Sequence, residues 1–157
     1  MIQAVDTNVL VYAHLPTTAE HERVRRFLHK RLAAPRVTLA VTPMVLHELV
    51  HVITDPRRFD PPVTMSEGRA IARLYLGRSN VTCLAPDEEA IADAFALLEH
   101  HQLGRKRIAD TLLAATLLRH GVGEIITCNS ADFAPFAGLS VVDPRHWPTP
   151  NGRASSK

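Results

Sequence analysis

Apolar residues along the chain alternate between short continuous runs and longer stretches in which they recur every three or four positions. The short runs are rich in Val and Ile and are bounded by turn-forming residues, so they predict β-strands. We expect strands at residues 2–5, 37–42, 81–84, 124–128 and 139–142. The stretches between these strands have the helical period. Strands that alternate with helices in this way are typical of a parallel sheet covered on both faces.

Start and stop signals delimit the expected helices. Thr17-x-x-Glu20 and Thr64-x-x-Glu67 have the form of capping boxes at helix N-termini. We expect helices after these two boxes, at 44–54 following Pro43, after Asp87-Glu88-Glu89, and at 107–118. The helix after Asp87-Glu88-Glu89 is expected to have the apolar face Ile91, Ala94, Phe95 and Leu98. The first strand ends at Asp6-Thr7-Asn8, residues that favour turns and helix caps.

Short strands and short helices predict an α/β fold. We expect a three-layer α/β/α sandwich with a central parallel sheet of about five strands, rather than a closed barrel of eight βα units. One domain is expected over residues 1–147. The Pro-, Gly- and Ser-rich segment 148–157 is expected to be a flexible C-terminal tail.

Composition narrows the classes of protein that remain. The chain has 157 residues, 46% of them apolar, with a formal net charge of +2, which argues against a strongly basic nucleic-acid packaging protein. Cys83 and Cys128 stand alone in apolar stretches and are interpreted as small core residues. The sequence shows neither a secretory leader nor a membrane-spanning run, so we expect a cytoplasmic protein.

Four carboxylates occupy positions that indicate a functional site. Asp6 closes the first strand, Glu48 and Asp110 interrupt apolar helical stretches, and Asp132 follows the fourth strand. We expect Glu48 and Asp110 to be buried, where a carboxylate is costly unless it is paired or bound to a metal. The structural alternatives are a turn or cap for Asp6 and Asp132, an Arg ion pair for Glu48 and a helix-dipole contact for Asp110. Carboxylate oxygens without clustered Cys or His suit hard cations such as Mg²⁺ or Mn²⁺.

These motifs resemble those of PIN-domain ribonucleases. The resemblance rests on Asp6-Thr7-Asn8, on Glu48, on Asp110 ahead of Thr-Leu-Leu-Ala-Ala-Thr, and on Thr127-x-Asn129-x-x-Asp132-Phe133. Within that family, the segment 52–59 is similar to a stretch of the VapC toxins of VapBC toxin–antitoxin pairs. Many PIN domains carry Asp where this chain has Asn129, so the resemblance makes Asp132 the fourth acid.

The resemblance implies an activity, a site and partners. The activity is that of an endoribonuclease dependent on Mg²⁺ or Mn²⁺, which uses a metal-activated water and leaves 5′-phosphate and 3′-hydroxyl ends. Asp6 and Asp110 would hold the principal metal, with Glu48 and Asp132 completing the site. Supporting residues would be Thr7, Asn8, Thr127 and Asn129, and Arg105, Lys106 and Arg107 would either contact RNA phosphates or form a solvated loop. The implied partners are RNA, a VapB-type antitoxin and a second copy of the chain in a homodimer.

Two readings from other classes remain open. His47-Glu48-x-x-His51 matches the H-E-x-x-H signature of zinc peptidases, in which two His bind zinc and Glu is the base. That reading leaves Asp6, Asp110 and Asp132 without a function. The second alternative is a non-catalytic interaction domain, for which the acids would not be needed.

Overall fold

The computed structural model describes residues 1–147, so the expected tail at 148–157 lies outside the described residues. Within residues 1–147 the chain forms five strands and seven α-helices, with two short 3-10 helices. The elements in chain order are β1 (Ile2–Val5), α1 (Thr7–His14), α2 (His21–Ala33), β2 (Thr38–Val41), α3 (Pro43–Ile53), α4 (Met65–Leu76), β3 (Val81–Cys83), α5 (Glu88–His100), η1 (Arg105–Arg107), α6 (Ile108–Arg119), β4 (Glu124–Ile126), α7 (Ser130–Phe133), β5 (Ser140–Val142) and η2 (Pro144–His146).

The five strands form one parallel sheet in the order β3-β2-β1-β4-β5. β1 lies at the centre and pairs with β2 on one side and with β4 on the other, in the register Ala4 to Ala40 and Ala4 to Ile125. The chain builds outward from β1 to β3 and then crosses over to β4. The order therefore reverses between β1 and β4, and in open parallel sheets ligands bind at such a point, beyond the carboxyl ends of the strands.

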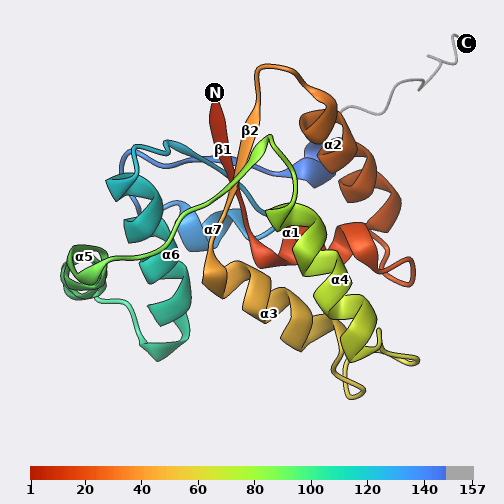
Figure 1. The fold of residues 1–157 in the computed structure, drawn as a ribbon. Helices are drawn as coiled ribbons and strands as arrows, with labels where there is room; N and C mark the ends of the chain where they lie inside the picture. The colour runs from red at the N-terminus through yellow and green to blue at the C-terminus, as the bar shows by residue number, and fades with distance from the viewer. Residues whose placement is uncertain (148–157) are drawn as a thin grey trace, which may run out of the picture.

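Helices cover both faces of the sheet, as expected, so the three-layer α/β/α fold is confirmed. α1 packs on α2 and α3, and α3 packs on α4, whereas α5 packs on α6. In Figure 1, α5 and α6 lie on the opposite side of β1 and β2 from α2 and α4. The central strands are almost wholly buried, since Ala4, Val5 and Ile125 are each 1% exposed or less. Burial on both faces explains why the strands are continuously apolar.

The N-terminal third differs from the expectation in two ways. The helix α1, which begins at Thr7, was not expected, although its N-cap is Asp6, in agreement with the cap alternative for that residue. The Thr17-x-x-Glu20 pattern forms no capping box: Glu20 precedes α2 without a side-chain cap hydrogen bond. The second box is present as expected, because Thr64 and Glu67 cap α4 reciprocally.

Two expectations about buried residues were also wrong. α5 packs through Ala90 and Ala94, whereas Ile91 is 41% and Phe95 is 63% exposed. Cys83 ends β3 and is exposed, although Cys128 is buried as expected. In α5 and in β3 the apolar residues of the sequence extend beyond the positions that face the core. None of the helices within residues 1–147 is long and apolar enough to cross a membrane.

Candidate active site

Asp6 occupies the point where the strand order reverses. Its backbone N–H donates to the carbonyl of Ile126 at 3.0 Å, which ties the end of β1 to the end of β4. Asp6 is 8% exposed, and its carboxylate accepts a hydrogen bond from the N–H of Thr7, the first residue of α1, at 2.7 Å. The second carboxylate oxygen accepts from Asn8 Nδ2 at 2.6 Å and from Thr127 Oγ1 at 2.7 Å. Neutral donors alone therefore fix the orientation of this acid.

Asn8 and Thr127 extend this network to the loop after β4. Asn8 Nδ2 also lies 3.2 Å from Thr127 Oγ1, and Asn8 Oδ1 accepts from the Cys128 N–H at 3.0 Å. Thr127 Oγ1 accepts from the Asn129 N–H at 2.9 Å. Two of the four expected supporting residues, Asn8 and Thr127, thus contact Asp6 through their side chains. Asn129 contributes through its backbone, and its side chain makes no cap hydrogen bond at the start of α7.

Glu48 faces the same region from α3. Its Oε2 accepts a hydrogen bond from Thr7 Oγ1 at 2.7 Å, so the fourth supporting residue holds the second acid. Glu48 is exposed rather than buried, which corrects the expectation. The reason is that α3 is amphipathic: its buried side is formed by Val45, Leu46, Leu49, Val52 and Ile53.

Asp110 and Asp132 are joined by one guanidinium. Arg107 Nε lies 3.5 Å from Asp110 Oδ2, and its Nη1 lies 3.2 Å from Asp132 Oδ1. Arg107 also donates to the backbone carbonyl of Asp132. The two carboxylates are about one-third exposed, at 31% and 34%. Asp132 lies inside α7, whose N-cap is Asn129, so the reading of Asp132 as the cap is wrong.

The carboxylates interact electrostatically. Burial raises the pKa of Asp6, against the lowering effect of its hydrogen bonds to Thr127, Thr7 and Asn8. The pKa of Asp110 is raised to about 6, first by burial and then by repulsion from Asp6 and Asp132, with Arg107 opposing the shift. Repulsion from Glu48 contributes to both shifts. The fold therefore gathers the four predicted acids into one acidic cluster, defined here as Asp6, Glu48, Asp110 and Asp132.

The donor set of the acidic cluster fits a hard divalent cation. All four acidic side chains offer oxygen, and the excess of negative charge is what a cation would offset. Across the part of the chain that the structure describes, no three His, Cys, Asp or Glu side chains are gathered closely enough to hold a metal ion. The Arg107 guanidinium instead occupies the space between Asp110 and Asp132.

The three basic residues before α6 differ from one another. Arg105 and Lys106 are exposed, and within residues 1–147 neither forms an ion pair, so both remain candidates for phosphate contacts. Arg107 points into the acidic cluster instead. The sequence reasoning missed this contact, although the spacing of three residues between Arg107 and Asp110 on a helical turn was a signal for it.

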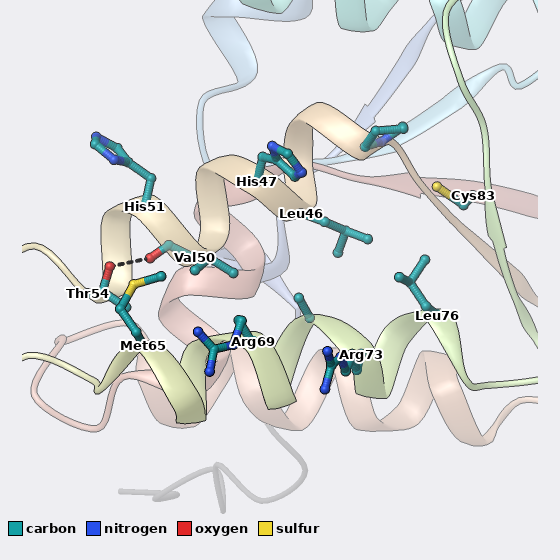
Figure 2. A pocket seen from close by; sticks show the side chains of 12 residues that line it. Leu46, His47, Val50, His51, Thr54, Met65, Arg69, Arg73, Leu76 and Cys83 are labelled. Atoms are coloured by element: carbon teal, nitrogen blue, oxygen red, sulfur yellow. Dashed lines mark hydrogen bonds between the residues drawn. The ribbon is translucent and has the colours of Figure 1, made fainter.

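His47 and His51 lie on a different side of α3 from the Thr7 contact of Glu48. Figure 2 shows both His beside the groove between α3 and α4, together with Arg69 and Arg73 of α4. Within residues 1–147, no third His, Cys, Asp or Glu joins them in a group that could hold a metal. Since Glu48 is bound to Thr7 at the acidic cluster, the geometry does not favour the zinc-peptidase reading.

The fold and the site define a class of protein, a nuclease-like α/β domain with an acidic cluster at the β1–β4 edge. Comparison with known proteins agrees with this class. The PIN domain model matches residues 4–139. The chain is 30% identical over 141 residues to ribonuclease VapC24 of Mycobacterium tuberculosis, an alignment that covers 90% of this chain and 95% of that protein. The chain belongs to the PIN-domain family.

Two solved structures of similar fold are a toxin and a VapBC complex. VapC20 of Mycobacterium tuberculosis, described as a sarcin–ricin loop cleaving toxin, has a TM-score of 0.66 at 17% identity, covering 87% of this chain and 98% of its own. VapBC2 of Rickettsia felis, bound to a promoter DNA fragment, has a TM-score of 0.62 at 19% identity, covering 90% and 98%. At these identities the likeness concerns the fold.

Proposed function

We propose that this protein is a metal-dependent endoribonuclease that acts as the toxin of a type II toxin–antitoxin pair. The observation that carries the proposal is the acidic cluster at the β1–β4 switch point, with Asp6 held by three hydrogen bonds and coupled by charge to the other acids. The ribonuclease relative at 30% identity supports the same activity.

Asp6 and Asp110 would hold the principal Mg²⁺ or Mn²⁺, and Glu48 and Asp132 would complete the site. When bound, the cation supplies an activated water for attack on a phosphodiester and stabilises the negative charge that develops. Thr7, Asn8 and Thr127 fix the carboxylates in place, which reduces the reorganisation that the reaction requires. Arg105 and Lys106 bind RNA phosphates beside the cluster.

The test is cleavage of end-labelled RNA by the full chain. We expect cleavage with Mg²⁺ or Mn²⁺, none in EDTA, and products with 5′-phosphate and 3′-hydroxyl ends. Asp6→Asn should reduce the rate at least about 100-fold, because it removes a charge that the site needs. Asp60→Asn, at an exposed position, is the matched control and should cleave as the wild type does. Cyclic phosphate products, or cleavage in EDTA, would contradict the mechanism.

The toxin assignment follows from the VapC relative and from the VapBC complexes of similar fold. It implies a VapB-type antitoxin, and by the same resemblance a homodimer in the cytoplasm. The apolar helix faces within 44–54 and 71–76 are the candidate dimer contacts. Expression of the wild-type chain should arrest growth of a bacterial host, and co-expression of the cognate antitoxin should restore growth. Arrest by Asp6→Asn at equal protein level would separate toxicity from RNA cleavage and refute the assignment.

A further inference from the structure

The acidic cluster is divided into two parts that are neutralised in different ways. Asp6 accepts hydrogen bonds only from the Thr7 N–H, Asn8 and Thr127, all of them uncharged donors. Asp110 and Asp132 share a full positive charge, that of Arg107. Within residues 1–147, no other basic side chain forms an ion pair with any of the four acids. Arg107 is therefore the counter-ion of the described state.

The contacts of Arg107 are incomplete for a permanent structural ion pair. Its Nε lies 3.5 Å from Asp110 Oδ2 but donates no hydrogen bond, although the atom is buried. A buried N–H without an acceptor is costly. On the Asp110 side Arg107 is therefore held by charge and not by a hydrogen bond, whereas on the other side it donates to the Asp132 carbonyl. A structural Arg–carboxylate pair normally makes parallel bonds, as Arg145 does with Asp143, where Nε and Nη2 both donate at 3.2 Å or less.

The same oxygens would bind a divalent cation. Carboxylate oxygens that face a guanidinium are not free to ligate a metal, and a monovalent charge beside a divalent one is repelled strongly at these distances. The short 3-10 turn Arg105–Arg107 carries the side chain, which is 22% exposed and therefore has a route to solvent.

We propose that Arg107 is a displaceable internal counter-ion: it occupies Asp110 and Asp132 in the metal-free protein and leaves them when the divalent cation binds. This inference rests on the proposed metal-dependent function. Arg107 is a positioning residue in this scheme, because it acts on the cation through the two carboxylates. The consequence is that the metal-free enzyme holds its carboxylates together without a cation, and that cation affinity is lowered by the competition.

The experiment measures Mn²⁺ affinity by calorimetry and by electron paramagnetic resonance, independently of RNA cleavage. Arg107→Gln should bind Mn²⁺ about tenfold more tightly than the wild type, because the competing charge is gone. Arg25→Gln removes an exposed charge from α2, which contributes no residue to the acidic cluster, and is the control, with affinity within about twofold of the wild type. Arg107→Lys restores the charge and should return the affinity toward the wild-type value.

A second measurement uses the wild-type chain alone. The Nε–H resonance of Arg107, assigned by its loss in Arg107→Gln, should shift on titration with diamagnetic Mg²⁺ and follow the same binding curve. Unchanged or weaker Mn²⁺ binding in Arg107→Gln, or an Arg107 resonance that ignores Mg²⁺, would overturn the proposal. Failure of the wild type itself to bind Mn²⁺ is a different result, and would refute the metal-dependent function.

Discussion

The helix α3 presents two sides that carry similar polar residues and have different surroundings. On one side, Glu48 joins the acidic cluster through Thr7. On another side, His47 and His51 line a groove of about 660 Å³ between α3 and α4, whose other lining residues are largely apolar. The comparison teaches that a short motif can be split by the fold between two regions. H-E-x-x-H requires its three residues to serve one site, and here Glu48 and the two His do not.

Replacing Glu48 tests the first side of α3 and should have a much larger effect on RNA cleavage than any change on the groove side. Glu48→Gln keeps a group that can accept the Thr7 hydrogen bond but removes the charge, so we expect RNA cleavage to fall about 100-fold. Glu99→Gln, on the exposed surface of α5, is the control and should leave cleavage unchanged. A Glu48→Gln enzyme within twofold of the wild type would remove Glu48 from the site.

Removing the hydrogen bond from Thr127 to Asp6 should reduce RNA cleavage less than removing one of the acids. Thr127→Val keeps the shape of a fully buried side chain and removes the donor to Asp6, so we expect about a tenfold loss of cleavage and about 2 kcal/mol of stability. Thr116→Val is the matched control: Thr116 is equally buried, but its hydroxyl donates to the Leu112 carbonyl within α6. Equal effects of the two variants in cleavage assays and denaturant melts would show that the hydrogen bond to Asp6 contributes nothing specific to cleavage or stability.

Burial of the Asp110 carboxylate, together with repulsion from the neighbouring acids, should appear in the stability of the metal-free protein. Its folded pKa is raised from 3.8 to about 6, so between these values the folded state binds more protons than the unfolded state. Stability should therefore fall as the pH rises through this window. Asp110→Asn removes the contribution, which is about 1 kcal/mol after discounting for a side chain 31% exposed.

Thermal melts in EDTA at pH 7 measure this contribution. The Tm of Asp110→Asn should exceed that of the wild type by roughly 2–4 °C, although the variant should lose RNA cleavage. The difference in Tm should vanish near pH 4, where the wild-type carboxyl is protonated. A lower Tm at pH 7 would mean that the Arg107 ion pair outweighs the repulsion.

The groove side of α3 should show the smallest effect on cleavage. The double variant His47→Ala with His51→Ala is expected to stay within about twofold of the wild type, because neither imidazole contacts the acidic cluster in the described structure. The same RNA assay, repeated with Zn²⁺ in place of Mg²⁺, checks for a hidden zinc site. Zinc-dependent peptide cleavage that disappears in the double variant would revive the peptidase reading.

Most of the sheet could be predicted from sequence, because parallel strands buried on both faces are short apolar runs with clear boundaries. Three of the segments that carry the acids could be placed at one edge for the same reason, since carboxyl ends of parallel strands meet there. Asp110 lies in α6, which follows a helix and not a strand, so its place in the site came from the family resemblance. α1 was missed because a helix of eight residues that starts on Asp6-Thr7-Asn8 has the same local signals as a turn. The apolar run Val9–Val11 inside it was the neglected sign of a buried element.

Exposure was harder to predict than position. Glu48 was expected to be buried because its neighbours along the chain are apolar, yet burial depends on the angle around the helix axis. The ion pair of Arg107 with Asp110 follows from local spacing, whereas the pair with Asp132 joins residues 25 positions apart. Contacts of that kind depend on how α6 and α7 pack, which no local pattern records.

The hydrogen bond from Thr127 to Asp6 spans 121 positions of sequence. A chain that emerges from the ribosome with its N-terminus first therefore exposes Asp6 long before Thr127 has been made. The oriented carboxylate can form only after β4 has paired with β1. A folding intermediate in which this pairing is missing contains Asp6 but lacks the geometry that the proposed chemistry needs.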